Sequence, residues 1–400
     1  MSMIPRETYS DMITANLAVA LAVARAKPKI IAAYPISPMT SIVEYLAEFV
    51  AEGDLDAEYV RVEGEHSAMT VVAAAQGTGV RTFTSTASQG LAYMHEVVSA
   101  TGGMRLPCVM FVANRTLMSP GGIWPELSDS MPERDSSWIQ IYVGDNQEAF
   151  DMILQAYKIA EDSRVLLPVM ICGDGYILTH SSETVEILGE KEVDDFLPPY
   201  KAEHAFLDIE RPTAQGIIVP PQYHMEAKWQ MHQAMRNATE VIEEVNKEFA
   251  VKFGRDHGGL IQEYEMEDAE RALVVIGSVS GTVRGVVDEL RRKGERVGMV
   301  ILRVFRPFPV DRIVKTLKDV KAIGVFDRSM SFGSAGQCFL EVKNALYGKT
   351  TPILNFIAGL GGLDVREKDI EYMFSKLSEI EKEEKIKDPI IFVNTRGITS

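Results

Sequence analysis

Short apolar segments of strand length alternate along this chain with longer segments whose apolar residues recur at helical spacing. This alternation constrains the fold strongly, because strands that alternate with helices form a mainly parallel sheet covered by helices on both faces. In the N-terminal part we predict strands over Lys29–Ala33, Glu58–Val62, Arg81–Ser85, Pro107–Ala113 and Val165–Cys172. The intervening helices are predicted over Thr14–Ala26, Thr40–Glu52, Ser67–Gly79, Gly90–Thr101 and Gln147–Glu161.

The alternation breaks off after the strand that ends at Cys172 and resumes at Ala272. Between the two stretches we predict proline-bearing irregular segments, a long, charged and exposed helix over Met225–Phe253, and a linker over Asp256–Glu267. We expect two α/β domains, residues 1–255 and 256–400, the first with an irregular and helical extension from about residue 190. In the second domain the predicted strands are Ala272–Ile276, Gly298–Leu302, Lys321–Phe326 and Ile353–Ile357, the predicted helices are Ser280–Lys293, Val310–Val320 and Cys338–Leu346, and a helical surface tail starts at Ser375.

The charge and the cysteine content exclude several classes of function. A formal net charge of −16 argues against a general nucleic-acid binder and against binding to an anionic membrane surface. The sequence shows no secretory signal pattern and no apolar run of about 18 residues, so we expect a cytoplasmic protein without a membrane span. Cys108, Cys172 and Cys338 are isolated, which excludes a disulfide scaffold, a zinc ribbon and a cysteine-ligated iron–sulfur cluster within this chain. We expect all three to be buried thiols.

Two glycine-containing motifs are compatible both with a ligand site and with ordinary structure. Arg81–Gly90 reads RTFTSTASQG, which predicts a strand, a hydroxyl-rich turn and a helix. The first amides of that helix can hold an anion, and a capped helix start explains the same pattern equally well. Gly173–Gly175 reads Gly-Asp-Gly, but a magnesium motif that begins this way needs a nearby asparagine, and the next one is Asn237. We interpret this segment as a turn at the end of a strand.

Two charged residues stand beside segments that we predict to be buried. Glu65 begins an apolar helix, where it either complements the helix dipole or, once buried, needs a partner such as a protonated ring nitrogen of a cofactor. Arg115 closes the strand Pro107–Ala113, and ligands bind at the carboxyl ends of strands in open α/β sheets. Its guanidinium could clamp a carboxylate, and a surface salt bridge is an equal alternative. The long loop Met118–Arg134 is a candidate binding loop.

Several motifs occur in one order across most of the chain, namely Tyr34–Pro38, Glu63–Ala68, Thr84–Gly90, Asn114–Arg115, Ser128–Trp138 and Phe305–Pro309. In this combination the chain resembles the α subunit of the 2-oxoacid:ferredoxin oxidoreductases, the pyruvate:ferredoxin oxidoreductase group. The resemblance implies two thiamine-enzyme-like parallel-sheet domains, a pyrimidine-binding domain and a domain like the C-terminal domain of transketolase. It also implies that thiamine diphosphate is shared with a β subunit. Magnesium and [4Fe-4S] clusters would belong to partner subunits of β, γ and δ type, and this chain would bind no metal.

The resemblance assigns roles to individual residues. Glu65 would be catalytic, because its carboxylate would hydrogen-bond the aminopyrimidine ring and favour the imino tautomer that removes the thiazolium proton. Ser37, where the family usually has threonine, and Arg115 would bind the substrate carboxylate, and Met118 and Ile123 would lie beside the substrate. The further cofactor contacts implied are Tyr34, Pro35, Ile36, Ser88 and Gln89.

The implied activity is oxidative decarboxylation of a 2-oxoacid to an acyl-coenzyme A in anaerobic metabolism, with electrons passing to ferredoxin or to an NAD-linked acceptor. Pyruvate is the common substrate of the group. Oxalate-oxidising relatives carry Arg at the position of Ser37 and Asp at that of Met118, so oxalate is not expected. Ser37, Met118 and Gly121–Gly122 also leave room for a branched or aromatic 2-oxoacid such as phenylglyoxylate. The alternatives are a non-catalytic scaffold for partner subunits and, disfavoured by the missing diphosphate motif, a free-standing decarboxylase or transketolase.

Overall fold

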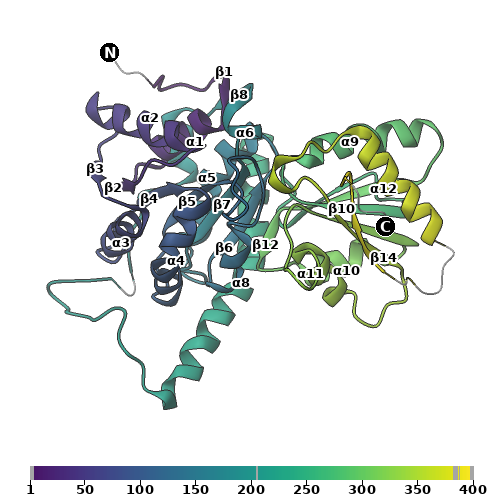
Figure 1. Cartoon of the computed structure of the whole chain (residues 1–400). Coiled ribbons are helices and arrows are strands. Elements are labelled where there is room, and N and C mark those ends of the chain that lie inside the picture. Colours follow the sequence, from purple (N-terminus) through teal and green to yellow (C-terminus); the bar gives the residue numbers. More distant parts are fainter. Residues whose placement is uncertain (1–3, 204–205, 382–385, 387, 397–400) are drawn as a thin grey trace.

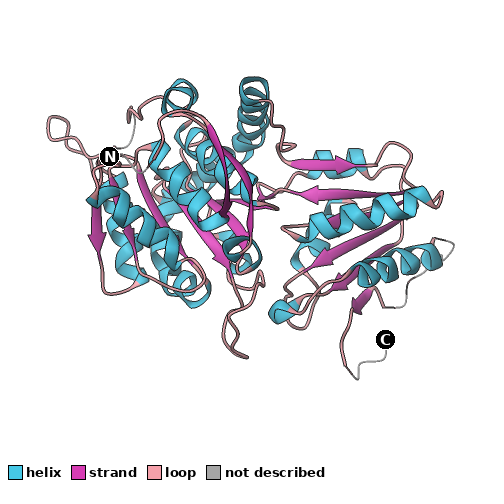
Figure 2. Ribbon diagram, turned by 90° about the horizontal axis from the view of Figure 1, so that it is seen from above, coloured by secondary structure: helices cyan, strands magenta, loops and turns pink. Residues whose placement is uncertain are grey.

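The computed structural model describes residues 4–203, 206–381, 386 and 388–396, which form two lobes side by side (Figure 1). Each lobe is built on a mainly parallel sheet, and the view from above separates the two sheets (Figure 2). The predicted class of two α/β domains with parallel sheets is therefore confirmed. Among the described residues, no helix is both long and apolar enough to cross a membrane.

The sheet of the first lobe has seven strands in the order β12-β6-β7-β5-β4-β2-β3, and only β12 runs antiparallel to its neighbour. Strands β6 and β12 were not among the predicted strands. Strand β12 comes from the C-terminal half of the chain, so this sheet is not built from one continuous segment. The predicted boundary between the two domains at residue 255 stays a prediction. The strands are β2 (Ile30–Ala33), β3 (Glu58–Arg61), β4 (Thr82–Thr86), β5 (Val109–Asn114), β6 (Ile139–Val143), β7 (Val169–Asp174) and β12 (Val304–Arg306).

Helices cover both faces of this first sheet. On one face lie α1 (Ala15–Ala26), α2 (Thr40–Ala51), α5 (Asn146–Glu161) and the C-terminal half of α8 (Pro221–Phe253). On the other face lie α3 (Glu65–Gln76) and α4 (Ser88–Gly103). Strands β1 (Tyr9–Thr14) and β8 (Ser182–Ile187) form a separate antiparallel pair, and the short helices are α6 (Ile177–His180) and α7 (Glu190–Phe196).

The sheet of the second lobe has six strands in the order β15-β14-β13-β10-β11-β9, and only β9 is antiparallel. Strand β9 (Ile261–Tyr264) lies inside the segment that we predicted to be a linker, so that prediction was wrong there. The other elements are β10 (Arg271–Val275), β11 (Val297–Leu302), β13 (Ala322–Asp327), β14 (Ile353–Ile357), β15 (Ile390–Phe392), α9 (Val279–Arg292), α10 (Val310–Thr316), α11 (Gln337–Ala345), α12 (Glu367–Ile380), and the 3-10 turns η1 (Met131–Asp135, in the first lobe) and η2 (Leu360–Gly362).

The C-terminal helix differs from the predicted surface tail. Helix α12 begins at Glu367, before Ser375, and it buries Leu377 and Ile380 against the second sheet. The tail is thus in part a core helix, because its apolar residues recur at helical spacing and face one side. The part of the predicted tail over residues 382–385, at 387 and over 397–400 lies outside the described residues.

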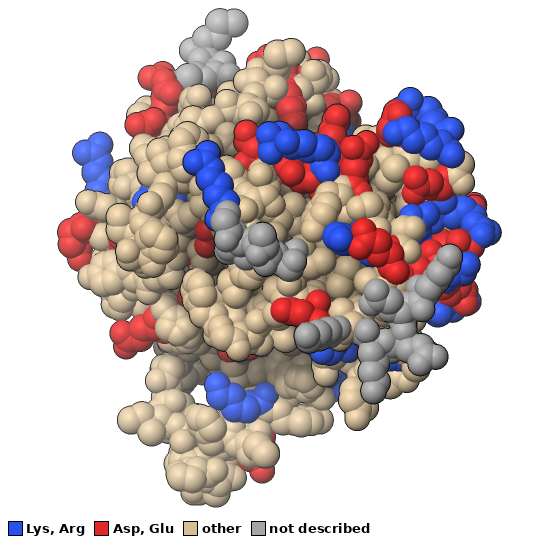
Figure 3. Space-filling view, turned by 45° about the vertical axis from the view of Figure 1, so that its right-hand side comes forward, with Lys and Arg blue, Asp and Glu red and all other residues tan. Residues whose placement is uncertain are grey.

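The two lobes share one apolar core. A single cluster of buried residues runs from Met69 and Trp138 in the first lobe to Ile276 and Phe339 in the second. Over the second lobe, at the right of Figure 3, basic and acidic side chains are interspersed. A shared core fixes the orientation of the lobes, since separating them would expose apolar surface to water.

Candidate functional site

The carboxyl ends of three adjacent parallel strands bring most of the predicted site residues to one edge of the first sheet. Strand β2 ends at Ala33 and leads into the segment 34–38. Strand β4 ends at Thr86 and turns into α4 at Ser88, and β5 ends at Asn114, directly before Arg115. Because these strands lie next to one another in the order β5-β4-β2, segments far apart in sequence meet here.

Arg115 is the centre of this meeting point. Its Nη1 donates to the carbonyl of Ser37 at 2.7 Å, its Nε donates to the carbonyl of Gly122 at 3.1 Å, and its Nη2 donates to the Gln89 side-chain oxygen at 3.3 Å. The side chain is buried, yet no carboxylate of the described residues forms an ion pair with it. The alternative of a surface salt bridge is therefore wrong. A buried guanidinium that meets only neutral acceptors is suited to bind an anion.

Glu65 is the first residue of α3 and is half-buried, less deeply than its apolar helix suggested. None of the hydrogen bonds in the described part of the chain ends on its carboxylate. It packs against α4, where a Cβ atom added to Gly90 would lie 2.8 Å from Oε1 and 2.9 Å from Cγ of Glu65. The missing side chain of Gly90 thus creates the space in which this carboxylate lies. An unpartnered carboxylate at a helix start fits a ligand with a hydrogen-bond donor, which is what the aminopyrimidine ring of thiamine diphosphate offers.

The turn between β4 and α4 has a backbone that non-glycine residues rarely adopt. Ser88 has φ = 49° and is fully buried. Its hydroxyl donates to the Thr116 carbonyl, and its backbone N–H donates to the Asp129 carboxylate at 2.9 Å. A left-handed conformation costs of order 1 kcal/mol and persists where surrounding bonds hold it, which is common at functional sites.

The remaining predicted contacts lie at the open side of this edge. Tyr34, Pro35 and Ser37 are exposed, and Ile36 is half-buried. Met118 and Ile123 are exposed on the loop after Arg115, as is their neighbour Trp124, which our sequence analysis placed only in the binding loop. The structure therefore brings Ser37, Ser88, Gln89 and Arg115 into one connected group, with Glu65 next to it through Gly90. Met118 and Ile123 are not part of this hydrogen-bonded group.

Asp129 is the residue whose importance our sequence analysis missed. It is only 2% exposed and accepts four hydrogen bonds, from the start of α4, from the end of β5 and Arg115 directly after it, and from its own loop. Burial raises the pKa of its carboxyl group to about 6, against the lowering effect of those donors. The sequence marked only its place in the loop Met118–Arg134, because its partners are distant in sequence.

The Gly173–Gly175 segment has a structural role. Asp174 ends β7, accepts from the Ser278 backbone N–H at 2.8 Å and pairs with Arg328 at 3.0 Å, so it connects the two lobes. This geometry fits our interpretation as a strand-end turn. Within the described ranges, no group of three or more His, Cys, Asp or Glu residues is arranged to hold a metal ion. The three cysteines are free and buried, as predicted, and burial raises the pKa of Cys108 to about 12.

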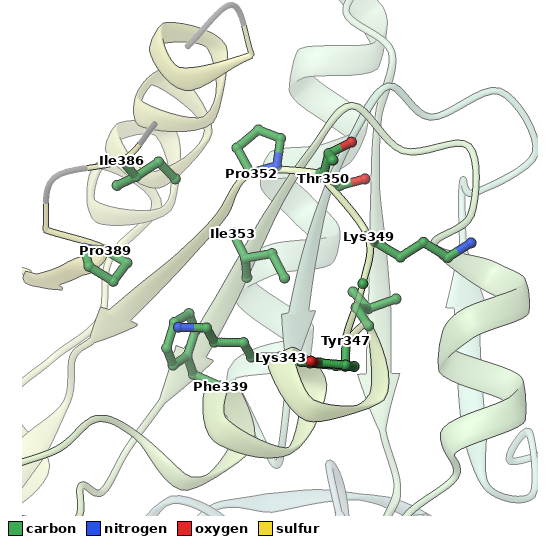
Figure 4. A pocket seen from close by; sticks show the side chains of 12 residues that line it. Phe339, Lys343, Tyr347, Lys349, Thr350, Pro352, Ile353, Ile386 and Pro389 are labelled. Atoms are coloured by element: carbon green, nitrogen blue, oxygen red, sulfur yellow. The ribbon is translucent and has the colours of Figure 1, made fainter. Parts of the chain in front are cut away.

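A separate hollow of about 380 Å³ lies in the second lobe between α11 and the start of β14 (Figure 4). The side chains of Phe339, Lys343, Tyr347 and Ile353 point toward it. None of the predicted site residues lines it. The candidate site is therefore the strand edge of the first lobe, where Tyr34, Pro35 and Ser37 are exposed.

Two solved structures share this fold. The 2-oxoglutarate:ferredoxin oxidoreductase from Magnetococcus marinus gives a TM-score of 0.70 at 17% identity, over 93% of this chain and 65% of that one. A split-gene transketolase, solved as an inactive β4 tetramer, gives a TM-score of 0.57 at 12% identity, over 93% of this chain and 100% of that one. At these identities the likeness concerns the fold, and it confirms thiamine-enzyme-like domains.

Comparison of sequences identifies the family. Residues 21–247 match the model "Pyruvate flavodoxin/ferredoxin oxidoreductase, thiamine diP-bdg", and residues 269–370 match "Pyruvate:ferredoxin oxidoreductase core domain II". Pyruvate synthase subunit PorA of Methanocaldococcus jannaschii is 49% identical over 372 residues, 92% of this chain and 95% of that protein. Ketoisovalerate oxidoreductase subunit VorA of Pyrococcus horikoshii is 40% identical over 381 residues, 95% and 96% of the two chains. The chain therefore belongs to the pyruvate flavodoxin/ferredoxin oxidoreductase family, a group of 2-oxoacid oxidoreductases, and contains its thiamine-diphosphate-binding domain.

Proposed function

We propose that this chain is the α subunit of a multi-subunit 2-oxoacid oxidoreductase and that it supplies half of the active site. That half holds the substrate carboxylate at Arg115 and the aminopyrimidine ring at Glu65. The observation that carries the proposal is the buried guanidinium of Arg115, which donates to neutral acceptors on Ser37 and Gln89. The unpartnered carboxylate of Glu65 lies against Gly90, the residue after Gln89. A scaffold protein has no physical reason to keep a buried cation without a carboxylate partner, since that arrangement costs stability.

Each residue of this half-site has a separate task. The Arg115 guanidinium and the Ser37 hydroxyl bind and orient the substrate carboxylate. The Glu65 carboxylate accepts a hydrogen bond from a protonated ring nitrogen of the cofactor. Tyr34, Pro35, Ile36 and Ser88 lie along the same edge of the sheet. Thiamine diphosphate, when bound, supplies the nucleophilic carbon that makes decarboxylation of a 2-oxoacid possible. A longer acid at position 65 suits this task better than aspartate, which is one methylene shorter.

The overall reaction converts a 2-oxoacid anion and coenzyme A to an acyl-coenzyme A, carbon dioxide and a proton, and two electrons leave one at a time. We propose that β, γ and δ type subunits carry the diphosphate anchor, Mg²⁺ and the iron–sulfur clusters, as the resemblance of this chain to the α subunits of the family implies. Ferredoxin is the proposed acceptor, with an NAD-linked acceptor as the alternative. The free thiols favour a reducing compartment, so we propose a cytoplasmic complex.

Pyruvate is the proposed substrate. Relatives named pyruvate synthase subunits are up to 49% identical, whereas the ketoisovalerate relatives are 40% identical. A branched or aromatic 2-oxoacid is the second candidate. It is favoured by the apolar side chains of Met118 and Ile123, which are exposed on the loop after Arg115.

Substitution of Glu65 tests the catalytic assignment. In the purified complex, Glu65→Gln should lower kcat by about 10²- to 10⁴-fold, because a neutral amide does not stabilise a protonated ring nitrogen as a carboxylate does. The assay reduces a viologen dye with a panel of 2-oxoacids, with and without coenzyme A. Glu63→Gln is the matched control, because Glu63 is exposed and its carboxylate accepts a hydrogen bond from Ser67. Full activity of Glu65→Gln, or turnover by the isolated chain, would contradict the proposal.

A further inference from the structure

One buried carboxylate joins the segments that converge on the candidate site. Oδ2 of Asp129 accepts the backbone N–H of Ser88 at 2.9 Å and the backbone N–H of Arg115 at 2.9 Å. Oδ1 accepts the Asn114 side-chain amide at 2.8 Å and the N–H of Ser130 at 2.8 Å. The carboxylate therefore ties the start of α4, the end of β5 and the loop before η1 to one another.

The two backbone groups held by Oδ2 belong to the residues that orient the site. The N–H of Ser88 is held while its φ is 49°, so this bond helps to maintain a backbone that serine otherwise avoids. The next residue, Gln89, meets the Arg115 guanidinium at 3.3 Å. Arg115 is thus joined to the start of α4 twice, by the bond of its side chain to Gln89 and by the Asp129 carboxylate that binds the backbone N–H groups of Arg115 and Ser88.

The energetics of Asp129 argue for a specific role. It is buried, and no lysine, arginine or histidine of the described chain forms an ion pair with it. A buried carboxylate without a cation is costly, so four neutral donors are what makes its ionised form tolerable. Asparagine has a single acceptor oxygen and adds two donors, so it cannot satisfy the same four N–H groups.

We infer that Asp129 is a positioning residue of the 2-oxoacid site, which acts by anchoring the backbone of Arg115 and Ser88 so that the Arg115 guanidinium points at the substrate carboxylate. This inference rests on the function proposed above. Both carboxylate oxygens of Asp129 are occupied by protein N–H groups, so its effect on the substrate would pass through Arg115 and Gln89. It should therefore govern substrate binding more than the chemical step.

Asp129→Asn in the purified complex tests this assignment. The KM for pyruvate should rise about 10- to 100-fold while kcat changes less, because a small displacement of the binding group weakens substrate binding. Glu133→Gln is the structural control: Glu133 is another buried acid of the same loop, but its side chain bonds to His95. Asp135→Asn is the exposed control. An unchanged KM in Asp129→Asn, or an equal rise in Glu133→Gln, overturns the inference.

Amide hydrogen exchange of the full-length chain without partners gives a readout that does not depend on turnover. The N–H groups of Ser88 and Arg115 should exchange at least about tenfold faster in Asp129→Asn than in the wild type, since their acceptor is weakened. The amides of β7, such as that of Ile171, should keep their protection. Unchanged exchange at Ser88 and Arg115 counts against the anchor.

The wild-type complex provides a test that survives a folding failure of the variant. Protonation of Asp129 removes acceptor capacity, so the KM for pyruvate should rise as the pH falls through about 6, whereas the substrate carboxylate stays ionised. Tyr142 and Cys172 interact electrostatically with Asp129, and burial raises the pKa of each well above its usual range, so both stay neutral. Arg115, whose backbone N–H bonds to Asp129, and Asp174, which is paired with Arg328, are the charged residues of the adjacent strand ends.

Glu133 and its partner His95 lie in the same region, and burial raises the pKa of Glu133 as well. The rise in KM should therefore persist in Glu133→Gln. A flat KM across this pH range, or its loss in Glu133→Gln, rejects Asp129 as the responsible group. If the wild-type complex turns over no 2-oxoacid at all, the proposed function fails, while the exchange experiment still decides whether Asp129 anchors the two amides.

Discussion

Single atoms decide the geometry of the candidate site at the residue scale. Gly90 is the third residue of α4, and a Cβ atom there would lie 2.4 Å from Oγ1 of Thr86 and 2.8 Å from Oε1 of Glu65. These separations are far below van der Waals contact. Thr86 is β-branched and buried in β4, so it has little freedom to move, and the displacement would fall on Glu65.

Gly90→Ala should therefore reduce kcat at least about tenfold by displacing Glu65, while the chain still folds. On helix propensity alone, alanine would be favoured over glycine by about 1 kcal/mol, so a loss of activity would come from the clash and not from the helix. Gly103→Ala in the same helix is the control, because nothing lies within 4 Å of its added Cβ. Activity would be measured in the complex, with circular dichroism to monitor folding. A fully active Gly90→Ala complex would falsify this account of the glycine.

Helix α8 shows at the element scale that one helix can have two environments. Its C-terminal half buries Val241, Val245 and Phe249 against the first lobe. Its N-terminal half extends away from that lobe, together with the preceding loop, and exposes Tyr223 and Trp229 (Figure 1). The predicted exposed helix over Met225–Phe253 is thus confirmed for its first half only. The C-terminal half of α8 is a core helix because its apolar residues recur on one face.

Two truncations in α8 should have opposite outcomes. Phe249→Ala should lower the free energy of unfolding by about 3–5 kcal/mol, because it leaves a cavity in the core. Trp229→Ala should change it by no more than about 0.5 kcal/mol, because Trp229 is 62% exposed. Urea unfolding of the isolated chain, followed by circular dichroism, measures both. Equal losses for the two variants would contradict the division of the helix.

The two lobes act as one unit at the scale of the whole molecule. Besides the shared core, the buried Arg303, which lies between β11 and β12, pairs with Glu148 on α5. The Tyr142 backbone N–H donates to the Arg303 carbonyl at 2.7 Å, next to the pairing of β12 with β6. Burial raises the pKa of Glu148, with Arg303 acting in the opposite direction.

Removing one member of this buried ion pair should lower the free energy of unfolding. Glu148→Gln should destabilise the isolated chain by about 3–5 kcal/mol, because it leaves the Arg303 charge buried without a counter-ion. Glu289→Gln removes an exposed partner of Arg292 and should cost less than about 1 kcal/mol. Differential scanning calorimetry gives both values and shows whether the lobes still unfold together. A Glu148→Gln chain as stable as the wild type would show that the pair does not hold the lobes.

The sequence by itself determined the α/β class, the order of most strands and helices, the buried cysteines and the family, because hydrophobic periodicity and short motifs are local properties of the chain. Several features were decided only by the tertiary structure: the addition of β12 to the first sheet, the strand β9 in a predicted linker, the contacts of Asp174 between the lobes, and the anchoring of Ser88 and Arg115 by Asp129. Each of these depends on contacts between segments that are distant in sequence. The roles of Glu65, Ser37, Arg115, Met118 and Ile123 stay predictions, and the structure adds that the buried Arg115 guanidinium donates to neutral acceptors from three separate segments.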